Sequence, residues 1–184
     1  MDTIKKIVDD IINIGSLEKK TTVFLIGNTT KVEDTEFYLS PIRNYHQIVV
    51  AGVIVFGEEA AKKIAKMIDS LVDYVFVDSE KKILDKHSVS TTPGNIERAV
   101  REIVVNSTLI SYKANDLTVD AADSFIVEYF SHDIASVGGK KTAIIGAGNI
   151  GSKIAIKLVE RGSDVSLYRR DTGKLNLAVD YINS

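Results

Sequence analysis

The feature that most limits the fold of this chain is a glycine motif between two short apolar runs. Residues 141–146 read as one apolar strand, and residues 164–169 as a second. Between them, residues 146–151 read Gly-Ala-Gly-Asn-Ile-Gly, and an amphipathic stretch continues to Gly162. A strand, a glycine turn, a helix and a second strand within about thirty residues are typical of a βαβ unit that binds a dinucleotide.

Each glycine of the motif has an expected physical role. Gly146 permits the tight turn, Gly148 lets a pyrophosphate approach the backbone, and Gly151 lets the helix pack closely on its strand. The alternative is that the glycines serve packing alone, without a nucleotide. The predicted cofactor-binding residues of the turn are Gly146, Ala147, Gly148, Asn149, Ile150 and Gly151.

The end of the second strand predicts which dinucleotide is bound. Arg169 and Arg170 offer bidentate charge to the 2′-phosphate of NADP, with Thr172 and Lys174 behind them. Asp171 keeps NAD open, because an acidic residue near this position binds the ribose 2′-hydroxyl. A solvated strand end is the alternative for the two arginines. The pattern favours NADP over NAD.

The segment from Gly139 to Ala178 resembles the nucleotide-binding domain of shikimate dehydrogenases, and also the related glutamyl-tRNA reductase and methylene-tetrahydrofolate dehydrogenase domains. In shikimate dehydrogenases an asparagine-arginine-threonine segment, followed by a lysine, holds the NADP phosphate. Residues 168–172 and Lys174 approximate that segment, with Tyr168 in place of asparagine and Asp171 inserted before the threonine. The resemblance implies a Rossmann fold and an NADP cofactor.

Helical and strand-like stretches alternate through the rest of the chain, which predicts an α/β fold. We expect an α/β substrate-type domain with a connecting helix over 1–138, followed by a partial doubly wound dinucleotide-binding unit over 139–184. The predicted strands of the first domain cover 22–27, 47–56, 73–78 and 108–114, and the predicted helices cover 2–14, 57–72, the stretch from a cap at Thr92 to about Asn106, and 119–130 after a cap at Thr118, with a surface loop at 28–46.

Lys113 and Asp116 are the candidate catalytic residues. The resemblance implies a catalytic lysine with an aspartate partner, and both residue types occur together just before the connecting helix. A lysine paired with a carboxylate can relay a proton to a carbinol oxygen during hydride transfer. The alternative is a solvated salt bridge in a loop. Asp120 and Asp123, one helical turn apart, are interpreted as partners of the helix dipole.

The composition bears on whether the chain binds nucleic acid, a membrane or a metal. The 184 residues carry a net charge of −2, so we expect no nucleic-acid partner and no anionic membrane surface. With no cysteine, and with His46, His87 and His132 far apart, we expect no metal site. The longest apolar run, 48–57, is too short to span a membrane, and the start of the chain lacks a signal-peptide pattern, so we expect a cytoplasmic protein.

Two functions follow from these observations. The first is an NADP-dependent oxidoreductase that moves hydride to or from a small polar substrate. The second is a non-catalytic nucleotide-binding module with a regulatory or interaction role. Because only two strands follow residue 139, we expect half of a doubly wound sheet, completed by chain beyond Ser184 or by a second copy in a homo-oligomer.

Overall fold

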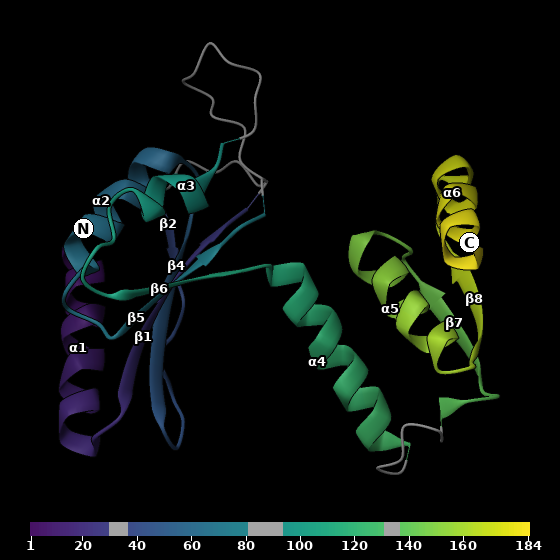
Figure 1. Ribbon diagram of the computed structural model, residues 1–184, viewed down its shortest axis with the longest axis horizontal. Coiled ribbons are helices and arrows are strands. Elements are labelled where there is room, and N and C mark those ends of the chain that lie inside the picture. The colour runs from purple at the N-terminus through teal and green to yellow at the C-terminus, as the bar shows by residue number, and fades with distance from the viewer. Residues whose placement is uncertain (30–36, 81–93, 131–136) are drawn as a thin grey trace. The chain divides into compact units, whose positions relative to one another are not determined.

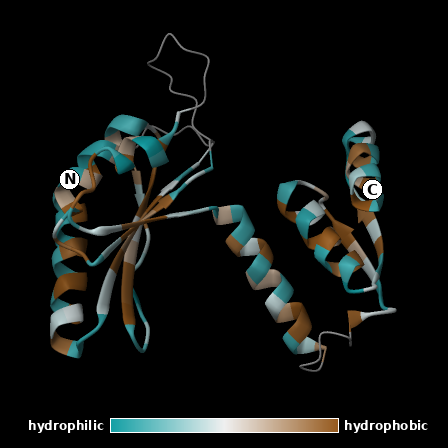
Figure 2. Cartoon of the chain, in the orientation of Figure 1, coloured by the Kyte–Doolittle hydropathy of each residue, from teal (hydrophilic) through white to brown (hydrophobic). Residues whose placement is uncertain are grey.

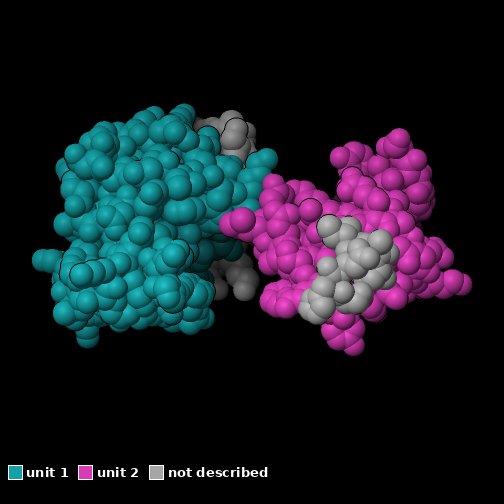
Figure 3. Space-filling view, turned by 60° about the horizontal axis from the view of Figure 1, so that its bottom comes forward, with its two compact units in different colours: residues 1–113 teal, residues 114–184 magenta. Residues whose placement is uncertain are grey.

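The chain has a mixed α/β fold with parallel strands, as predicted from its sequence. A computed structural model describes residues 1–29, 37–80, 94–130 and 137–184. These residues form two compact units, 1–113 and 114–184, which Figure 3 colours separately. By its contacts, the helix that we placed in the first domain groups with the second unit.

The first unit is built on a sheet in which four neighbouring strands are parallel. The strand order is β2-β4-β1-β5-β6, and β3 also pairs with β4. The two short strands β2 and β3 run antiparallel to β4. The elements of this unit are α1 (Asp2–Glu18), β1 (Thr21–Asn28), β2 (Phe37–Leu39), β3 (Arg43–Asn44), β4 (Ile48–Val55), α2 (Glu58–Ile68), β5 (Tyr74–Asp78), α3 (Ile96–Arg101) and β6 (Thr108–Tyr112).

The three helices α1, α2 and α3 cover one face of this sheet (Figure 1). They form with the sheet one core of buried aliphatic side chains and Phe24, visible as brown segments in Figure 2. On the other face, Val23 is buried, whereas Leu25, Val50, Ile54 and Phe76 are only half-buried. Burial of aliphatic area on the helix side is the main favourable term that holds the unit together. The buried strand residues of that face are Phe24, Ile26, Val49, Ala51, Val53, Val55, Val75 and Val77.

Helix α1 continues through Gly15 to Glu18, past its predicted end, and α2 ends at Ile68, before its predicted end at 72. Three further element boundaries differ from those predicted. The stretch 28–46, predicted as a loop, contains β2 and β3, which gain backbone hydrogen bonds from the edge of β4. Helix α3 begins at Ile96, where the Asn95 side chain accepts the N–H of Arg98, and it ends at Arg101. The cap predicted at Thr92 lies outside the described residues.

The third difference is the start of helix α4 (Ala114–Tyr129), which begins one turn before the predicted cap at Thr118. The Thr118 hydroxyl donates to the carbonyl of Ala114, 2.9 Å away, so it bonds within the helix and does not cap it.

The second unit contains α4, β7 (Lys141–Ile145), α5 (Asn149–Glu160), β8 (Asp164–Tyr168) and α6 (Thr172–Asn183). Strands β7 and β8 pair in parallel, from Lys141 opposite Asp164 to Ile145 opposite Tyr168. Helix α5 therefore forms the crossover of a βαβ unit. Among the described residues, no helix has the length and apolar character that crossing a membrane requires.

Candidate functional site

The glycine turn joins β7 to α5 through a backbone conformation that favours glycine. Gly146 has a φ of 105°, outside the region that side chains readily allow. Its N–H donates to the carbonyl of Tyr168, 2.9 Å away, and the N–H of Ala147 donates to the same oxygen at 3.2 Å. These bonds fix the start of the turn against the end of β8.

The other two glycines of the motif differ in what surrounds them. A Cβ on Gly151 would collide with the carbonyl oxygen of Gly146 and lie 3.3 Å from Cγ2 of Ile144. This is the close helix–strand approach expected for the last glycine of the motif. A Cβ on Gly148 would meet no described atom within 4 Å. The packing of the protein therefore requires a glycine at 151 but leaves space beside Gly148.

The start of α5 presents backbone donors beside that space. Gly148 is the N-cap, and it has no side chain to accept the N–H groups of the first turn. The Gly148 carbonyl accepts the N–H of Ser152 at 2.9 Å, which begins the helical pattern. The N–H groups of Asn149 and Ile150 precede that bond and have no partner within the helix. Together with the helix dipole, such groups favour an anion.

Arg169 contacts the glycine turn directly. Its Nη1 donates to the carbonyl oxygen of Ala147 at 2.7 Å, and its side chain is partly buried. Arg170, the next residue, is exposed. The structure thus brings one of the two predicted arginines onto the turn, while the other lies at the surface between β8 and α6.

The remaining residues of the predicted phosphate site belong to the start of α6. Asp171 is the N-cap of this helix, and its carboxylate accepts the N–H of Lys174 at 3.0 Å. That hydrogen bond is the main reason why the pKa of Asp171 lies below its usual range. Thr172 is the first residue of α6, and Nζ of Lys174 lies 3.7 Å from the Asp171 carboxylate. Asp171 therefore has a capping role, which the sequence did not reveal.

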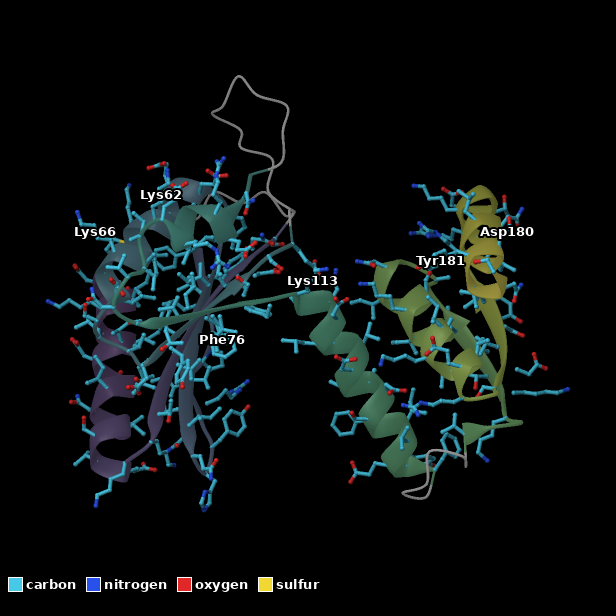
Figure 4. All side chains as sticks on the ribbon, viewed as in Figure 1. Lys62, Lys66, Phe76, Lys113, Asp180 and Tyr181 are labelled. Atoms are coloured by element: carbon cyan, nitrogen blue, oxygen red, sulfur yellow. The ribbon has the colours of Figure 1, made fainter. Side chains whose placement is uncertain are left out.

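Lys113 and Asp116 fall on opposite sides of the division between the units. Lys113 is the last residue of the first unit, directly after β6, and Figure 4 labels it there. Asp116 lies in the first turn of α4, and its carboxylate forms an ion pair with Lys153 of α5. The pairing of Lys113 with Asp116 stays a prediction.

An ion-pair ladder joins α4 to α5, and sequence reasoning missed it. Asp120 lies 3.2 Å from Nζ of Lys157, and Asp123 accepts two hydrogen bonds from Arg161, at 2.6 and 3.0 Å. The bonds from Arg161 are the main reason why the pKa of Asp123 is lowered. Asp120 and Asp123 were interpreted as dipole partners of their own helix, but their partners here are on another helix. The signal was the matching spacing of the basic residues 153, 157 and 161.

Three parallel strands of the first unit end in polar residues, which the sequence analysis did not identify as candidate site residues. Asn28 ends β1, Asp78 ends β5 and Tyr112 ends β6. All three ends lie at the carboxyl edge of the sheet, where ligands of parallel α/β sheets bind. They could have been recognised in the sequence, because each is the polar residue at the end of a mostly apolar run.

The sequence predicted no metal site, because the chain has no cysteine and its three histidines are far apart. His46 is exposed, whereas His87 and His132 lie outside the described residues. Within the described parts of the chain, no three His, Cys, Asp or Glu side chains gather as metal ligands would.

Comparisons with known proteins give one structural similarity to report. No protein-family model matches the chain, and no curated protein matches its sequence. The structure is similar to that of a hetero-hexameric glutamate dehydrogenase from Thermus thermophilus in its leucine-bound form, with 13% sequence identity and a TM-score of 0.39. The match covers 91% of this chain and 49% of that one, so the chain spans about half the length of this dehydrogenase.

Proposed function

We propose that the second unit binds a nicotinamide dinucleotide at the glycine turn, as part of an oxidoreductase. The observation that carries the proposal is the contrast between Gly151 and Gly148. The first glycine is required by contact with Gly146, whereas the second borders open space at the start of α5. A glycine that internal packing does not require, beside free helix N–H groups, fits a pyrophosphate.

NADP is the proposed cofactor. Arg169 and Arg170 follow β8, where the ribose of a bound dinucleotide is expected. Arg169 uses one of its five N–H donors in the hydrogen bond to the Ala147 carbonyl, so its guanidinium retains other donors for a phosphate. Thr172 and Lys174 supply a hydroxyl and a second positive charge near the same helix start. Asp171 is engaged as the cap of α6, which weakens the case for NAD.

Hydride transfer to or from a small polar substrate is the proposed reaction, in line with the resemblance to shikimate dehydrogenases. When bound, the nicotinamide would accept or give the hydride. Lys113 would move the proton of the substrate's carbinol or amine, with Asp116 as its partner. A second copy of the chain is a candidate partner, because Tyr168 at the end of the β7–β8 sheet is exposed, as is Ile145 beside it.

The ion pair between Asp116 and Lys153 favours a second candidate function. A carboxylate held by a lysine of α5 has an evident structural role without any proton transfer. A nucleotide-binding module that senses NADP or assembles with other proteins would need the glycine turn but not Lys113. The two functions share the cofactor and differ in turnover.

The direct test is calorimetric titration of the intact protein with NADP and NAD. We expect wild-type protein to bind NADP more tightly than NAD, and Gly148→Val to bind neither while it keeps its helical circular-dichroism signal. A branched side chain there would occupy the space that the pyrophosphate needs. Absence of binding by wild-type protein at millimolar cofactor would refute the proposal. Binding without turnover of any hydroxy or amino acid would favour the second function.

A further inference from the structure

Helix α4 has charged side chains on one side and apolar side chains on the other, and the charged side is the one that packs on α5. The carboxylates of Asp116, Asp120 and Asp123 all form ion pairs with basic residues of the α5 segment. Their spacings of four and three residues place them on one face of the helix. A surface helix usually has the reverse arrangement, with its apolar stripe against the protein and its charges in water. The side of α4 that faces away from α5 therefore calls for an explanation.

That other side carries a row of apolar residues spaced four apart, Leu117, Ala121, Phe125 and Tyr129, which we call the α4 ridge. Leu117 is 55% exposed, Phe125 73% and Tyr129 82%. Ala121 is exposed as well. Single exposed apolar residues are ordinary, but large apolar side chains exposed in a contiguous row mark an interaction surface.

The α4 ridge has the geometry with which two helices pack on each other. Rows of residues four apart interdigitate when two helices cross at about −50°. Helices that cross at this angle are closest at the crossing point and diverge toward their ends, so the centre needs a small side chain and the ends accept large ones. An antiparallel second copy of the ridge sets the small Ala121 opposite Phe125 at the centre. It sets Leu117 opposite Tyr129 toward the ends, and the twofold axis repeats both contacts.

Charge complementarity favours an antiparallel second copy as the partner. Lys113 directly precedes α4, Glu128 lies in its last turn, and both are exposed. An antiparallel pair brings Lys113 of one copy toward Glu128 of the other, at both ends of the crossing. A parallel pair would bring like charges together, which disfavours it.

We propose that two copies of the chain associate through the α4 ridge, as an antiparallel pair of helices about a twofold axis. The partner is a second copy, as in the proposed function, but this surface belongs to α4 and does not require the dinucleotide. A single helix crossing buries less than the roughly 800 Å² per partner of a standard interface. We therefore expect a weak, reversible dimer, with a Kd in the micromolar range or above.

The test is sedimentation velocity of the intact protein from micromolar to near-millimolar concentration, in which we expect wild-type protein to show a monomer–dimer equilibrium. Leu117→Asp should weaken dimerisation by about a hundredfold, tenfold for each copy of a carboxylate that would be buried without a partner. Leu177→Asp, at an exposed leucine of α6, is the matched control and should leave dimerisation unchanged. A monomer at every concentration, or equal effects of the two variants, overturns the proposal.

A second variant separates the proposed crossing from general apolar association. Ala121→Phe adds apolar area to the ridge but prevents the close approach of the two helices at their crossing point. We expect this variant to lose the dimer, and a dimer as strong as that of wild-type protein, or stronger, overturns the proposal.

Calorimetric titration of the same samples with NADP keeps this proposal apart from the dinucleotide site. Leu117→Asp should bind NADP as wild-type protein does, because the α4 ridge lies outside the glycine turn. Dimerisation of wild-type protein without any binding of NADP would refute the proposed function and leave the α4 ridge in place. Binding of NADP by a protein that stays monomeric would do the opposite.

Discussion

Asp123 of α4 and Arg161 at the end of α5 form a bidentate ion pair, with N–O distances of 2.6 and 3.0 Å. The Asp123 side chain is only 10% exposed, so the pair is largely shielded from water. Bidentate, charge-assisted bonds of this kind are among the strongest that side chains form. The ladder below it, from Asp120 to Lys157, is more exposed. Within the described residues, this pair is the most shielded of the ion pairs that join α4 to the α5 segment.

Asp123→Asn should therefore destabilise the second unit by about 2 kcal/mol, because it leaves the guanidinium of Arg161 without its charged partner. The measurement is urea unfolding of the intact chain, followed through the NMR signals of α5 amides. Asp120→Asn is the matched control, and it should cost no more than about 0.5 kcal/mol, since its carboxylate is 62% exposed. Equal losses in the two variants would contradict the importance assigned to Arg161.

Acid should weaken the first unit through Asp69. Burial alone would raise the pKa of this residue, but the N–H groups of Ser107, Asn106 and Val105 outweigh it and lower the pKa to about 2. A carboxylate whose pKa is lower when folded adds stability above its unfolded pKa, near 3.8, and that stability is lost as pH falls toward 2. Asp69→Asn should cost about 1–2 kcal/mol near neutral pH and much less near pH 2.

The Asp69 prediction is checked by measuring the free energy of unfolding of both proteins across this pH range. The difference between wild type and variant isolates Asp69, because Asp123 and the other carboxylates titrate in both proteins. A difference that stays constant from neutral pH to pH 2 would show that the hydrogen bonds do not depend on the charge of Asp69.

Local patterns in the sequence predicted the longer strands and the glycine turn, for a physical reason. An apolar run such as 22–27 or 73–78 is long enough for a buried strand, and the structure places β1 and β5 there. The positive φ of Gly146 follows from the turn itself, which depends on its immediate neighbours. Structural features that depend only on neighbouring residues could therefore be predicted from the sequence.

Features that depend on distant partners were not accessible in the same way. Whether Asp123 serves its own helix or another depends on Arg161, 38 residues later in the chain. The short strand β2 forms because β4 offers an unpaired edge, which no local pattern announces. The hydrogen bond from the Asn28 side chain to the carbonyl of Glu80 forms only because the fold places the ends of β1 and β5 side by side. In each case the sequence supplied the residue type, and the fold supplied its partner.

Gly151→Ala should destabilise the second unit by about 1–3 kcal/mol, the usual cost of overpacking a tight contact. The added methyl would meet the carbonyl oxygen of Gly146, which is backbone and cannot rotate away. Gly148→Ala is the control, and it should change the free energy of unfolding by less than about 1 kcal/mol because its methyl meets open space. Thermal unfolding of both variants provides the measurement, and a larger loss at Gly148 would contradict the packing roles described above.

Arg169 and Arg170 should differ in how they affect the choice of cofactor. Arg170→Ala removes an exposed charge and should lower NADP affinity by about tenfold with little change for NAD, because only NADP carries the 2′-phosphate. Arg169→Ala also removes the bond to Ala147, so it should weaken both cofactors and NADP the more. Calorimetric titration of each variant with both cofactors separates the two roles. Equal losses for NADP and NAD in Arg170→Ala would remove this residue from the phosphate site.

Lys113→Met should reduce turnover by roughly two to four orders of magnitude if Lys113 is the general acid–base group, while the affinity for NADP barely changes. Lys66→Met, at an exposed lysine of α2, is the control for loss of a surface charge, and it should leave turnover unchanged (Figure 4). The assay follows NADPH absorbance with a panel of hydroxy and amino acids, and it uses the longest natural chain that contains these residues.

Asp116 is tested in the same assay, because its ion pair with Lys153 allows two explanations. If Asp116 assists the proton transfer, Asp116→Asn should lower turnover far more than Lys153→Met does. If the ion pair only joins α4 to α5, the two variants should have the same small effect, and Asp116 leaves the proposed active site.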